Sequence, residues 1–290
     1  MFGTTVAVGD VTGDGFGDIA VGVPGENGEV GSVVVVPGRN GGPTGAGSTA
    51  VLAKSLKISG SWGESGLHFG ESLAVADLTG DGKAEVLVGA PYATVGSVKE
   101  SGRVAVLRGA ATGISATRSQ VVSQATTNVV GTAEAGDHWG ETLAVGDLTG
   151  DGRAEAVVGA PDEAVGTLKA AGGYTVLRAT SIGVTGTGSF AVSQNTTNVP
   201  GSAEAGDWFA GSLALVDVNG DGRRDVVAGA PFEVLAGRGD SPPAGAVSVQ
   251  LSGTSGRPAA GSFSYSGFDF SFSTTDKWWY FGSVVAAPVS

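Results

Sequence analysis

The hydrophobic and polar positions along the chain follow a pattern that repeats about every seventy residues. Each unit opens on an aromatic residue and a short apolar stretch, passes through a loop rich in Asp and Gly, and continues into an apolar run that ends at proline. The first Asp of each loop lies at positions 10, 77, 147 and 217, so the spacings are 67, 70 and 70 residues. A fixed period of this kind indicates an array of equivalent structural units.

The apolar segments of each unit predict β-strands. The runs after the loops, "IAVGVP", "VLVGAP", "AVVGAP" and "VVAGAP", are short and end at proline, which favours buried strands over helices. A third strand is expected at "GSVVVV", "GRVAVL", "GGYTVL" and "GAVSVQ", and a weaker fourth at segments such as "SLKIS" or "QVVSQ". Four strands per unit is the count of a propeller blade, so the sequence predicts an all-β protein with a β-propeller fold.

The predicted domain organisation is a single, partial propeller over residues 1–290. Its repeats are expected at 1–67, 68–137, 138–207 and 208–280, followed by a closing strand at 281–290, where an aromatic–Gly pair returns. Fifty-two glycines without a strict three-residue period are consistent with many tight turns between short strands.

The acidic loops carry the spacing of calcium ligands. In the first loop, Asp10, Thr12, Asp14 and Asp18 place side-chain oxygens at positions 1, 3, 5 and 9, with Gly15 at position 6. This spacing is typical of a calcium loop, in which position 7 offers its main-chain carbonyl and Gly allows the sharp turn. The alternative is that Asp and Gly simply form Asx-type turns. The predicted ligands are Asp10, Thr12, Asp14, Phe16 and Asp18; Asp77, Thr79, Asp81, Lys83 and Glu85; Asp147, Thr149, Asp151, Arg153 and Glu155; and Asp217, Asn219, Asp221, Arg223 and Asp225.

An EF-hand is excluded by position 12 of these loops. A bidentate Glu is needed there, whereas the chain has Val21, Val88, Val158 and Ala228, all inside the following apolar strand. Magnesium fits less well than calcium because it requires a tight octahedron and retains water ligands. About four Ca²⁺ ions, one per repeat, are therefore expected.

The net charge of -12 agrees with a cation partner. Twelve of the 28 acidic residues lie in the four loops, so four calcium ions would reduce the charge to about -4. An acidic chain is a poor partner for nucleic acid, whose phosphates attract clustered Lys and Arg. The chain has no cysteine, and it has no apolar run of the roughly 18 residues that membrane insertion requires.

The order of motifs, best preserved in "HFGESLAVADLTGDGKAEVLVGAP", resembles FG-GAP repeats, the units of the integrin alpha-chain head and of secreted bacterial proteins. The resemblance implies a closed ring of seven blades, of which this chain supplies four repeats and a terminal strand. Residues 1–290 are then expected to be part of a longer protein. The alternatives are a small ring, or an open arc that closes by oligomerisation. The resemblance also implies a secreted or cell-surface location and adhesion or recognition of an extracellular protein or glycan ligand.

No catalytic motif accompanies this pattern. The sequence contains no G-x-S-x-G, H-E-x-x-H or Walker loop, and His68 and His138 occupy equivalent positions that favour a structural role. We therefore predict a non-catalytic module. One alternative is the propeller part of a secreted hydrolase acting on glycans or lipids, and another is a purely structural spacer.

The remaining features are expected to be structural. Arg238, Gly239 and Asp240 form an RGD tripeptide that is expected by chance in a chain rich in Gly and Asp. The aromatic segment around "FDFSF" is expected to pack as the last strands of the fold. The acidic residues of the connectors between repeats are expected to be solvated loop charges: Glu134, Asp137, Glu204 and Asp207.

Overall fold

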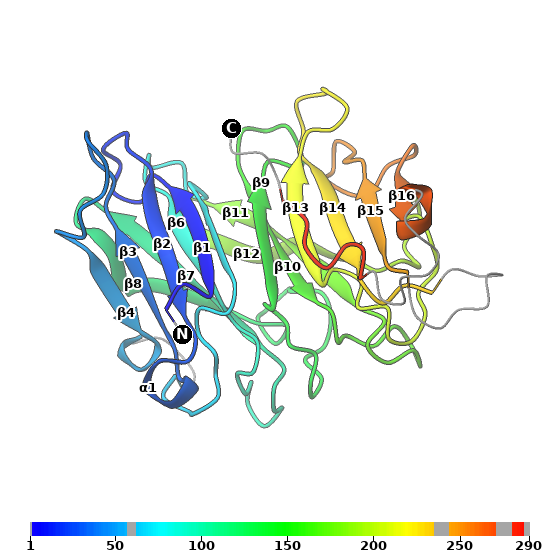
Figure 1. Cartoon of the computed structure of the whole chain (residues 1–290), viewed down its shortest axis with the longest axis horizontal. Helices are drawn as coiled ribbons and strands as arrows, with labels where there is room; N and C mark the ends of the chain where they lie inside the picture. The colour runs from blue at the N-terminus through cyan, green and yellow to red at the C-terminus, as the bar shows by residue number, and fades with distance from the viewer. Residues whose placement is uncertain (1, 57–61, 235–243, 271–279, 287–290) are drawn as a thin grey trace. The chain divides into compact units, whose positions relative to one another are not determined.

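A computed structural model describes residues 2–56, 62–234, 244–270 and 280–286 (Figure 1). In these residues, sixteen strands form four sheets, each with its four strands in sequence order. The predicted all-β class and the four-stranded β-propeller blades are thus confirmed. The RGD tripeptide and residues 57–61 lie outside the described residues.

The blades have the following strands. The first contains β1 (Thr5–Gly9), β2 (Asp18–Val23), β3 (Ser32–Val36) and β4 (Thr49–Leu52); the second contains β5 (Leu73–Ala76), β6 (Glu85–Ala90), β7 (Arg103–Ala110) and β8 (Gly113–Val122). The third contains β9 (Thr142–Gly146), β10 (Glu155–Ala160), β11 (Gly173–Thr180) and β12 (Gly183–Val192); the fourth contains β13 (Ser212–Val216), β14 (Asp225–Ala230), β15 (Ala246–Gln250) and β16 (Phe263–Ser266). Short helical turns are α1 (Glu26–Glu29), η1 (Ala53–Ser55) and η2 (Gly267–Phe270).

The fourth strand of the first blade differs from the prediction. It was expected at "SLKIS", but β4 lies a few residues earlier, at Thr49–Leu52, and pairs antiparallel with β3. The physical reason is that Val51 of β4 is buried in the core, beside Val33 of β3. The expected strand at "QVVSQ" coincides with the end of β8.

The chain divides into two compact units. The first comprises residues 1–145, 153–158 and 176–190, and the second comprises residues 146–152, 159–175 and 191–290. The first two blades belong to the first unit and the fourth blade belongs to the second, while residues of the third sheet occur in both.

The core of the first unit lies between its first two blades. Alternate residues of β3, including Val33 and Val35, pack in one cluster with Val86 and Val88 of β6 and Leu107 of β7. Strands whose alternate side chains face a neighbouring blade bury one face each, as the period of two in β-structure requires. Each fully buried aliphatic side chain stabilises the fold by roughly 1.5–3 kcal/mol.

The aromatic–Gly pair that opens a repeat docks on the preceding blade. Phe69 forms a bridge with Gly31, and the Gly70 carbonyl accepts a 2.8 Å hydrogen bond from the Thr5 hydroxyl. A Cβ atom added to Gly22 would lie 2.1 Å from the Gly70 oxygen. The glycine of the strand before proline is therefore required by the close approach of the next repeat.

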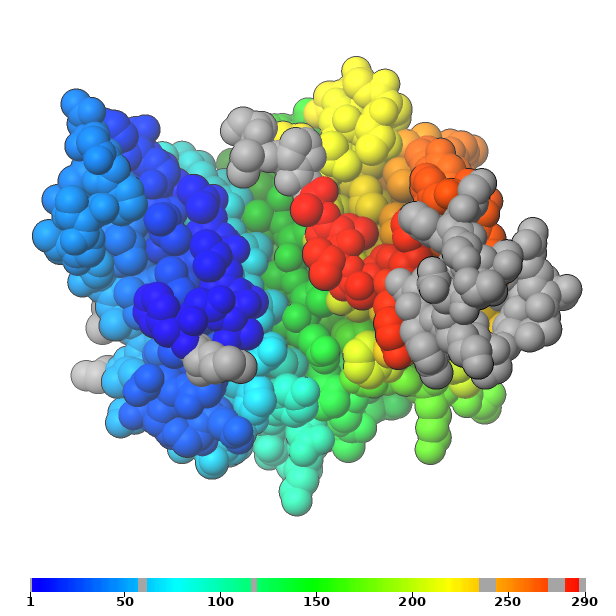
Figure 2. Space-filling model, viewed as in Figure 1, coloured from blue at the N-terminus to red at the C-terminus, as the bar shows by residue number. Residues whose placement is uncertain are grey.

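The same contact recurs further along the chain. In the first unit, the Gly140 carbonyl lies against Gly89 and accepts a 2.6 Å bond from the Ser72 hydroxyl. In the second unit, the Gly282 carbonyl lies against Gly229 and accepts a 2.7 Å bond from the Ser212 hydroxyl. The last described residues, 280–286, accordingly rest on the fourth blade, where Figure 2 shows the red atoms against the yellow ones.

The first aromatic–Gly pair, Phe2 and Gly3, does not dock on a preceding blade within the described residues. The Gly3 N–H donates to the Gly22 carbonyl at 3.1 Å, as the Gly70 N–H donates to Gly89 at 2.9 Å. Phe2 is nevertheless 70% exposed, and Val6 and Val8 of β1 are more than half exposed. Three apolar side chains at the start of the first blade are thus exposed to solvent in the described residues.

Candidate metal centre: the acidic loops

The first Asp of each loop organises the turn. Oδ1 of Asp10 accepts hydrogen bonds from the N–H groups of Gly13 and Asp14 at 2.7 and 3.1 Å, and Oδ2 accepts one from Gly15 at 2.8 Å. Gly13 and Gly15 have φ values of 74° and 88°, which glycine adopts without strain. The loop is therefore closed around the first predicted ligand by Asx-turn geometry.

The same arrangement lowers the pKa of the first Asp in the third and fourth loops. Burial would raise the pKa of Asp147, but four backbone N–H donors, led by those of Gly152 and Gly150, outweigh burial and lower it. The N–H of Gly222 is the main cause of a lowered pKa for Asp217. These first carboxylates are therefore held as anions, which is the form that binds a metal ion.

The carboxylate at position 9 ties the loop to the blade. Asp18 is fully buried and accepts hydrogen bonds from the N–H groups of Thr12 and Gly38 at 2.8 and 2.7 Å. In the fourth loop, Asp225 accepts bonds from Val218 and Ser252 at 3.0 and 2.8 Å. Because burial outweighs these bonds, the pKa of Asp225 is raised.

Position 3 of the first loop is the most informative. Thr12 is only 7% exposed, and its Oγ1 atom has no hydrogen-bond partner among the described residues. A buried hydroxyl left unpaired costs roughly 1–3 kcal/mol, and a metal ion that accepted its lone pair would remove that cost. Asp10, Asp14 and Asp18 form no ion pair with an arginine in the part of the chain that the structure describes. The donor set of the first loop therefore fits a calcium ion.

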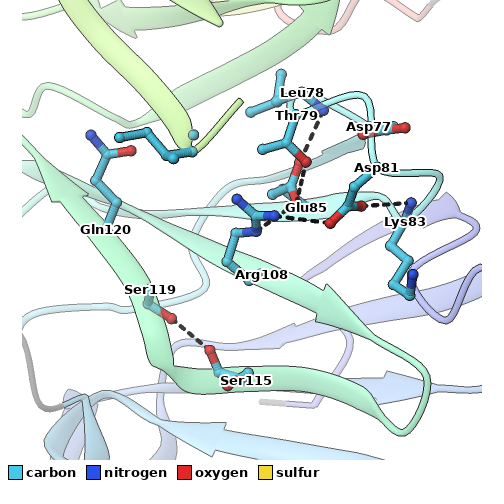
Figure 3. A network of polar contacts seen from close by, with 12 residues as sticks. Asp77, Leu78, Thr79, Asp81, Lys83, Glu85, Arg108, Ser115, Ser119 and Gln120 are labelled. Atoms are coloured by element: carbon cyan, nitrogen blue, oxygen red, sulfur yellow. Dashed lines mark hydrogen bonds and ion pairs between the residues drawn. The ribbon is translucent and has the colours of Figure 1, made fainter. Parts of the chain in front are cut away.

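The second loop differs because an arginine lies against it. Arg108 of β7 places Nη2 2.9 Å from Oδ2 of Asp81 and Nε 3.1 Å from Oε1 of Glu85, the latter without the alignment of a hydrogen bond (Figure 3). The Thr79 hydroxyl also donates to Glu85, at 3.4 Å. Burial raises the pKa of Glu85 despite the guanidinium charge. Three predicted ligands thus have protein partners, and one of those partners is itself a cation.

Arginines also contact the predicted ligands of the later loops. In the first unit, Arg178 forms a 3.1 Å ion pair with Glu155. In the second unit, Arg223 pairs with Asp221 at 2.5 Å, and the Asn219 amide donates to the same carboxylate at 3.1 Å. The four loops share one ligand pattern in sequence but differ in how many of their carboxylates are neutralised by arginine.

The two histidines belong to an aromatic contact between repeats. In the first unit, Tyr92 packs between His68 and His138 with ring centroids 4.7 and 4.5 Å apart. Corresponding rings of the second unit are Trp208, Phe232 and Tyr280, with centroids 5.2 and 5.3 Å apart. His68 and His138 also adopt positive φ values, so they shape the chain just before the docked aromatic. These contacts support the predicted structural role of the histidines.

The connectors contain buried acidic groups that the sequence analysis placed in solvent. Glu134 and Glu204 are exposed as predicted, but the prediction for Asp137 and Asp207 was wrong because both are almost fully buried. The carboxylate of Asp207 caps the connector by accepting a 2.6 Å hydrogen bond from the Glu204 N–H. Burial raises the pKa of Asp207 to about 6.

A buried Gln–Glu pair was missed altogether. Nε2 of Gln194 donates a 2.6 Å hydrogen bond to Oε2 of Glu233, and both side chains are buried. Burial raises the pKa of Glu233 to about 7, and the charges of Asp207 and Glu204 act in the same direction. The available signal was repetition, since "SQ" and the Glu two residues after "AP" each recur seventy residues apart.

Comparison with known proteins identifies the class to which these blades and loops belong. The FG-GAP repeat family matches residues 2–52, 69–107, 139–177 and 209–249, which together exceed half of the chain. The chain belongs to the FG-GAP repeat family.

Curated relatives include integrin alpha chains. The chain is 30% identical over 178 residues to integrin alpha pat-2 of Caenorhabditis elegans, covering 56% of this chain and 13% of that protein. It is 33% identical over 99 residues to integrin alpha-4 of Xenopus laevis, covering 34% of this chain and 9% of that protein. The chain thus spans a small part of the length of these relatives.

Two solved structures are similar to part of this chain. They are the exotype rhamnogalacturonan lyase YesX and the rhamnogalacturonan lyase YesW, both 16% identical, with TM-scores of 0.44 and 0.45. The matches cover 78% and 79% of this chain and 38% and 41% of those chains.

The helices in the described part of the chain are all too short to span a membrane.

Proposed function

We propose that the chain is a calcium-binding, non-catalytic recognition module of a secreted or cell-surface protein. Each acidic loop holds one Ca²⁺ ion through its carboxylates, its position-3 side chain and the carbonyl at position 7. The ion rigidifies the turn between the first two strands of a blade. The connectors between blades then present a stable surface to an extracellular protein or glycan.

The unpaired, buried Thr12 hydroxyl is the observation that carries the metal part of this proposal. A simple Asx turn explains the bonds to Asp10, but it gives no reason to bury a hydroxyl without a partner beside three carboxylates. Oxygen ligands of this kind suit the hard Ca²⁺ ion. A Ca²⁺ ion would stabilise the loop because its two positive charges offset the repulsion among the carboxylates of Asp10, Asp14 and Asp18.

The positions of the arginines predict different calcium affinities for the loops. The first loop, without an arginine partner, should bind Ca²⁺ most tightly, while Arg108 already supplies positive charge to the second loop. Because Arg108 must release Asp81 and Glu85 for both to act as ligands, calcium affinity of the second loop should be lower.

We infer the recognition part of the proposal from family membership. Integrin alpha chains are relatives of this chain, and FG-GAP repeats cover more than half of it. We prefer binding to catalysis because the recurrent carboxylates of the acidic loops are bonded to backbone N–H groups and arginines. A spacer role remains the outcome if no extracellular polymer binds.

Counting bound ions by native mass spectrometry tests the metal assignment. The full chain should bind about four Ca²⁺ ions at saturating calcium, one per loop. Thr12→Val keeps the shape of the side chain but removes the ligand oxygen, so it should weaken or remove one ion. Thr132→Val, in an exposed part of a connector, is the matched control and should retain the wild-type count. Equal counts for both variants would contradict the assignment of Thr12.

The recognition part needs a separate measurement. The calcium-loaded chain is passed over immobilised extracellular-matrix proteins and cell-surface glycans. Saturable binding to one of them supports recognition. Retention by none, in a sample with its full calcium count, would leave the spacer role instead.

A further inference from the structure

The second unit contains a cavity of about 320 Å³ between a connector and the fourth blade. The connector contributes Gln194, Pro200 and Gly201, and the floor is formed by small residues of β14, β15 and β16. These floor residues are Ala230, Ala246, Ser248, Ser264 and Ser266. The lining is completed by Tyr265, Phe268 and Asp269 at the end of the sheet, Glu233 from the loop after β14, and Phe209.

Comparison of the repeats shows why this space is open. Ala246 follows Gly245, which bridges to Phe281, just as Arg103 follows Gly102, which lies against Trp139. In the second blade, the Arg103 side chain fills the corresponding position and its guanidinium lies 5.6 Å from the centre of the Trp62 ring. The fourth blade has alanine there. The equivalent residues of the first and third blades, Ser32 and Gly173, are also small, so the second blade is the one in which a long side chain occupies this position.

The cavity contains hydrogen-bond acceptors that a donor group of a ligand could pair with. Gln194 is only 4% exposed, and its Oε1 atom has no partner among the described residues, while its Nε2 atom is bonded to Glu233. Glu233 adds a second acceptor, and burial brings its pKa to about 7. The serine hydroxyls of the floor can both donate and accept. A ligand with several hydroxyl groups matches this set.

An aromatic side chain accompanies these acceptors. Tyr265 is 46% exposed and is held edge-on by Phe263, with centroids 5.5 Å apart. Phe268 lines the same cavity. An exposed aromatic face beside clustered acceptors suits a pyranose, which has an apolar C–H face and polar edges. The volume lies at the low end of the range of about 300–1,000 Å³ for small-molecule sites, which suits one sugar residue.

We propose that this cavity binds one neutral pyranose unit, with Gln194 Oε1 accepting a hydrogen bond from a sugar hydroxyl and Tyr265 stacking on the sugar ring. Acidic sugars are disfavoured because Asp269 and Glu233 both line the site. The proposal deepens the recognition part of the proposed function, on which it rests, by naming a glycan as the ligand class and the fourth-blade end of the connector as its site. It does not depend on the calcium loops.

The test uses the full chain with saturating calcium. The probes are the methyl pyranosides of glucose, galactose and mannose, followed by saturation-transfer NMR and calorimetry. At least one of them should bind saturably, and methyl glucuronide should bind more weakly. Failure of all three neutral probes would overturn the proposal, as would binding of arginine methyl ester alone, which would show a cation site.

Variants locate the binding. Ala246→Arg places in the fourth blade the residue that fills this position in the second, and it should abolish binding. Tyr265→Ala should weaken binding by about tenfold through loss of the aromatic contact. Phe2→Ala, which removes an exposed aromatic side chain of the first unit outside the cavity lining, is the control and should stay within about twofold. Binding that survives both Ala246→Arg and Tyr265→Ala in folded protein would overturn the assigned site.

Calcium counts on the same samples keep the two proposals apart. A normal count without sugar binding refutes only the cavity proposal. Sugar binding in a chain that binds no calcium refutes only the metal proposal.

Discussion

Replacing Glu233 by Gln should change how the stability of the fold depends on pH. Gln has nearly the same shape, and its amide oxygen can still accept the hydrogen bond from Gln194. Unlike Glu, Gln does not ionise. The variant therefore removes one buried titratable group while keeping its neighbours in place.

The size of the effect follows from the pKa. Burial raises the pKa of Glu233 from 4.5 to about 7, which at 1.36 kcal/mol per pKa unit corresponds to roughly 3 kcal/mol. Between these two values the folded state holds a proton that the unfolded state has lost. Stability must therefore fall as pH rises from about 4.5 to about 7 and then level off. The free energy of unfolding of Glu233→Gln minus that of wild type should therefore be more favourable at pH 8 than at pH 4.5, by up to roughly 3 kcal/mol.

Denaturant unfolding at these two pH values, with calcium saturating throughout, measures this difference. The quantity compared is the stability of the variant minus that of wild type, so that titration of other groups cancels. Glu26→Gln, at an exposed carboxylate of α1, is the control and should show little pH dependence. The reasoning is refuted if the Glu233→Gln difference is the same at both pH values.

Two further predictions concern the second blade. Arg108→Gln leaves the buried Glu85 without its ion-pair partner, so stability should fall by roughly 3 kcal/mol in chelator and by less in calcium, which replaces the lost charge. Denaturant midpoints in both conditions test this, with the exposed Lys99→Gln as control; equal losses would contradict a calcium ion in the second loop. Gly89→Ala places a Cβ atom 2.1 Å from the Gly140 oxygen and should lower stability by roughly 2 kcal/mol or more. Gly63→Ala, with its nearest neighbour at 3.9 Å, should change stability by less than about 1 kcal/mol in a thermal melt, and similar values for the two would argue against the docking contact.

Much of the architecture could be predicted because the chain repeats itself. A Val-rich run such as "VLVGAP" predicts a buried strand, and the alignment of its four copies predicts where the turns between strands lie. The same alignment located the acidic loops by their oxygen spacing. The glycine two residues before the proline recurs in all four repeats, but the reason for it is a contact with a residue about fifty positions later, such as Gly140 against Gly89.

What the sequence could not provide were contacts between strands that are distant along the chain. Arg108 reaches Asp81 only because β7 pairs with β6, and a count of loop carboxylates does not reveal that pairing. Asp207 was expected in solvent because connectors are usually on the surface, yet it is buried and caps its own loop. The cavity beside Gln194 is lined by the small residue Ala246, where the second blade has Arg103, and a single repeat does not show this difference. The seven-bladed ring and the assignment of residues 1–290 to a single propeller domain stay predictions.

The central claim is that the acidic loops are calcium sites that stabilise the blades. Calorimetric titration of the chelator-treated chain with Ca²⁺, paired with thermal melts in calcium and in chelator, tests it most directly. We expect a stoichiometry near four and a melting temperature that rises strongly with calcium. A chain that shows no binding heat and the same melting temperature in both conditions would contradict the claim and leave the loops as Asx turns.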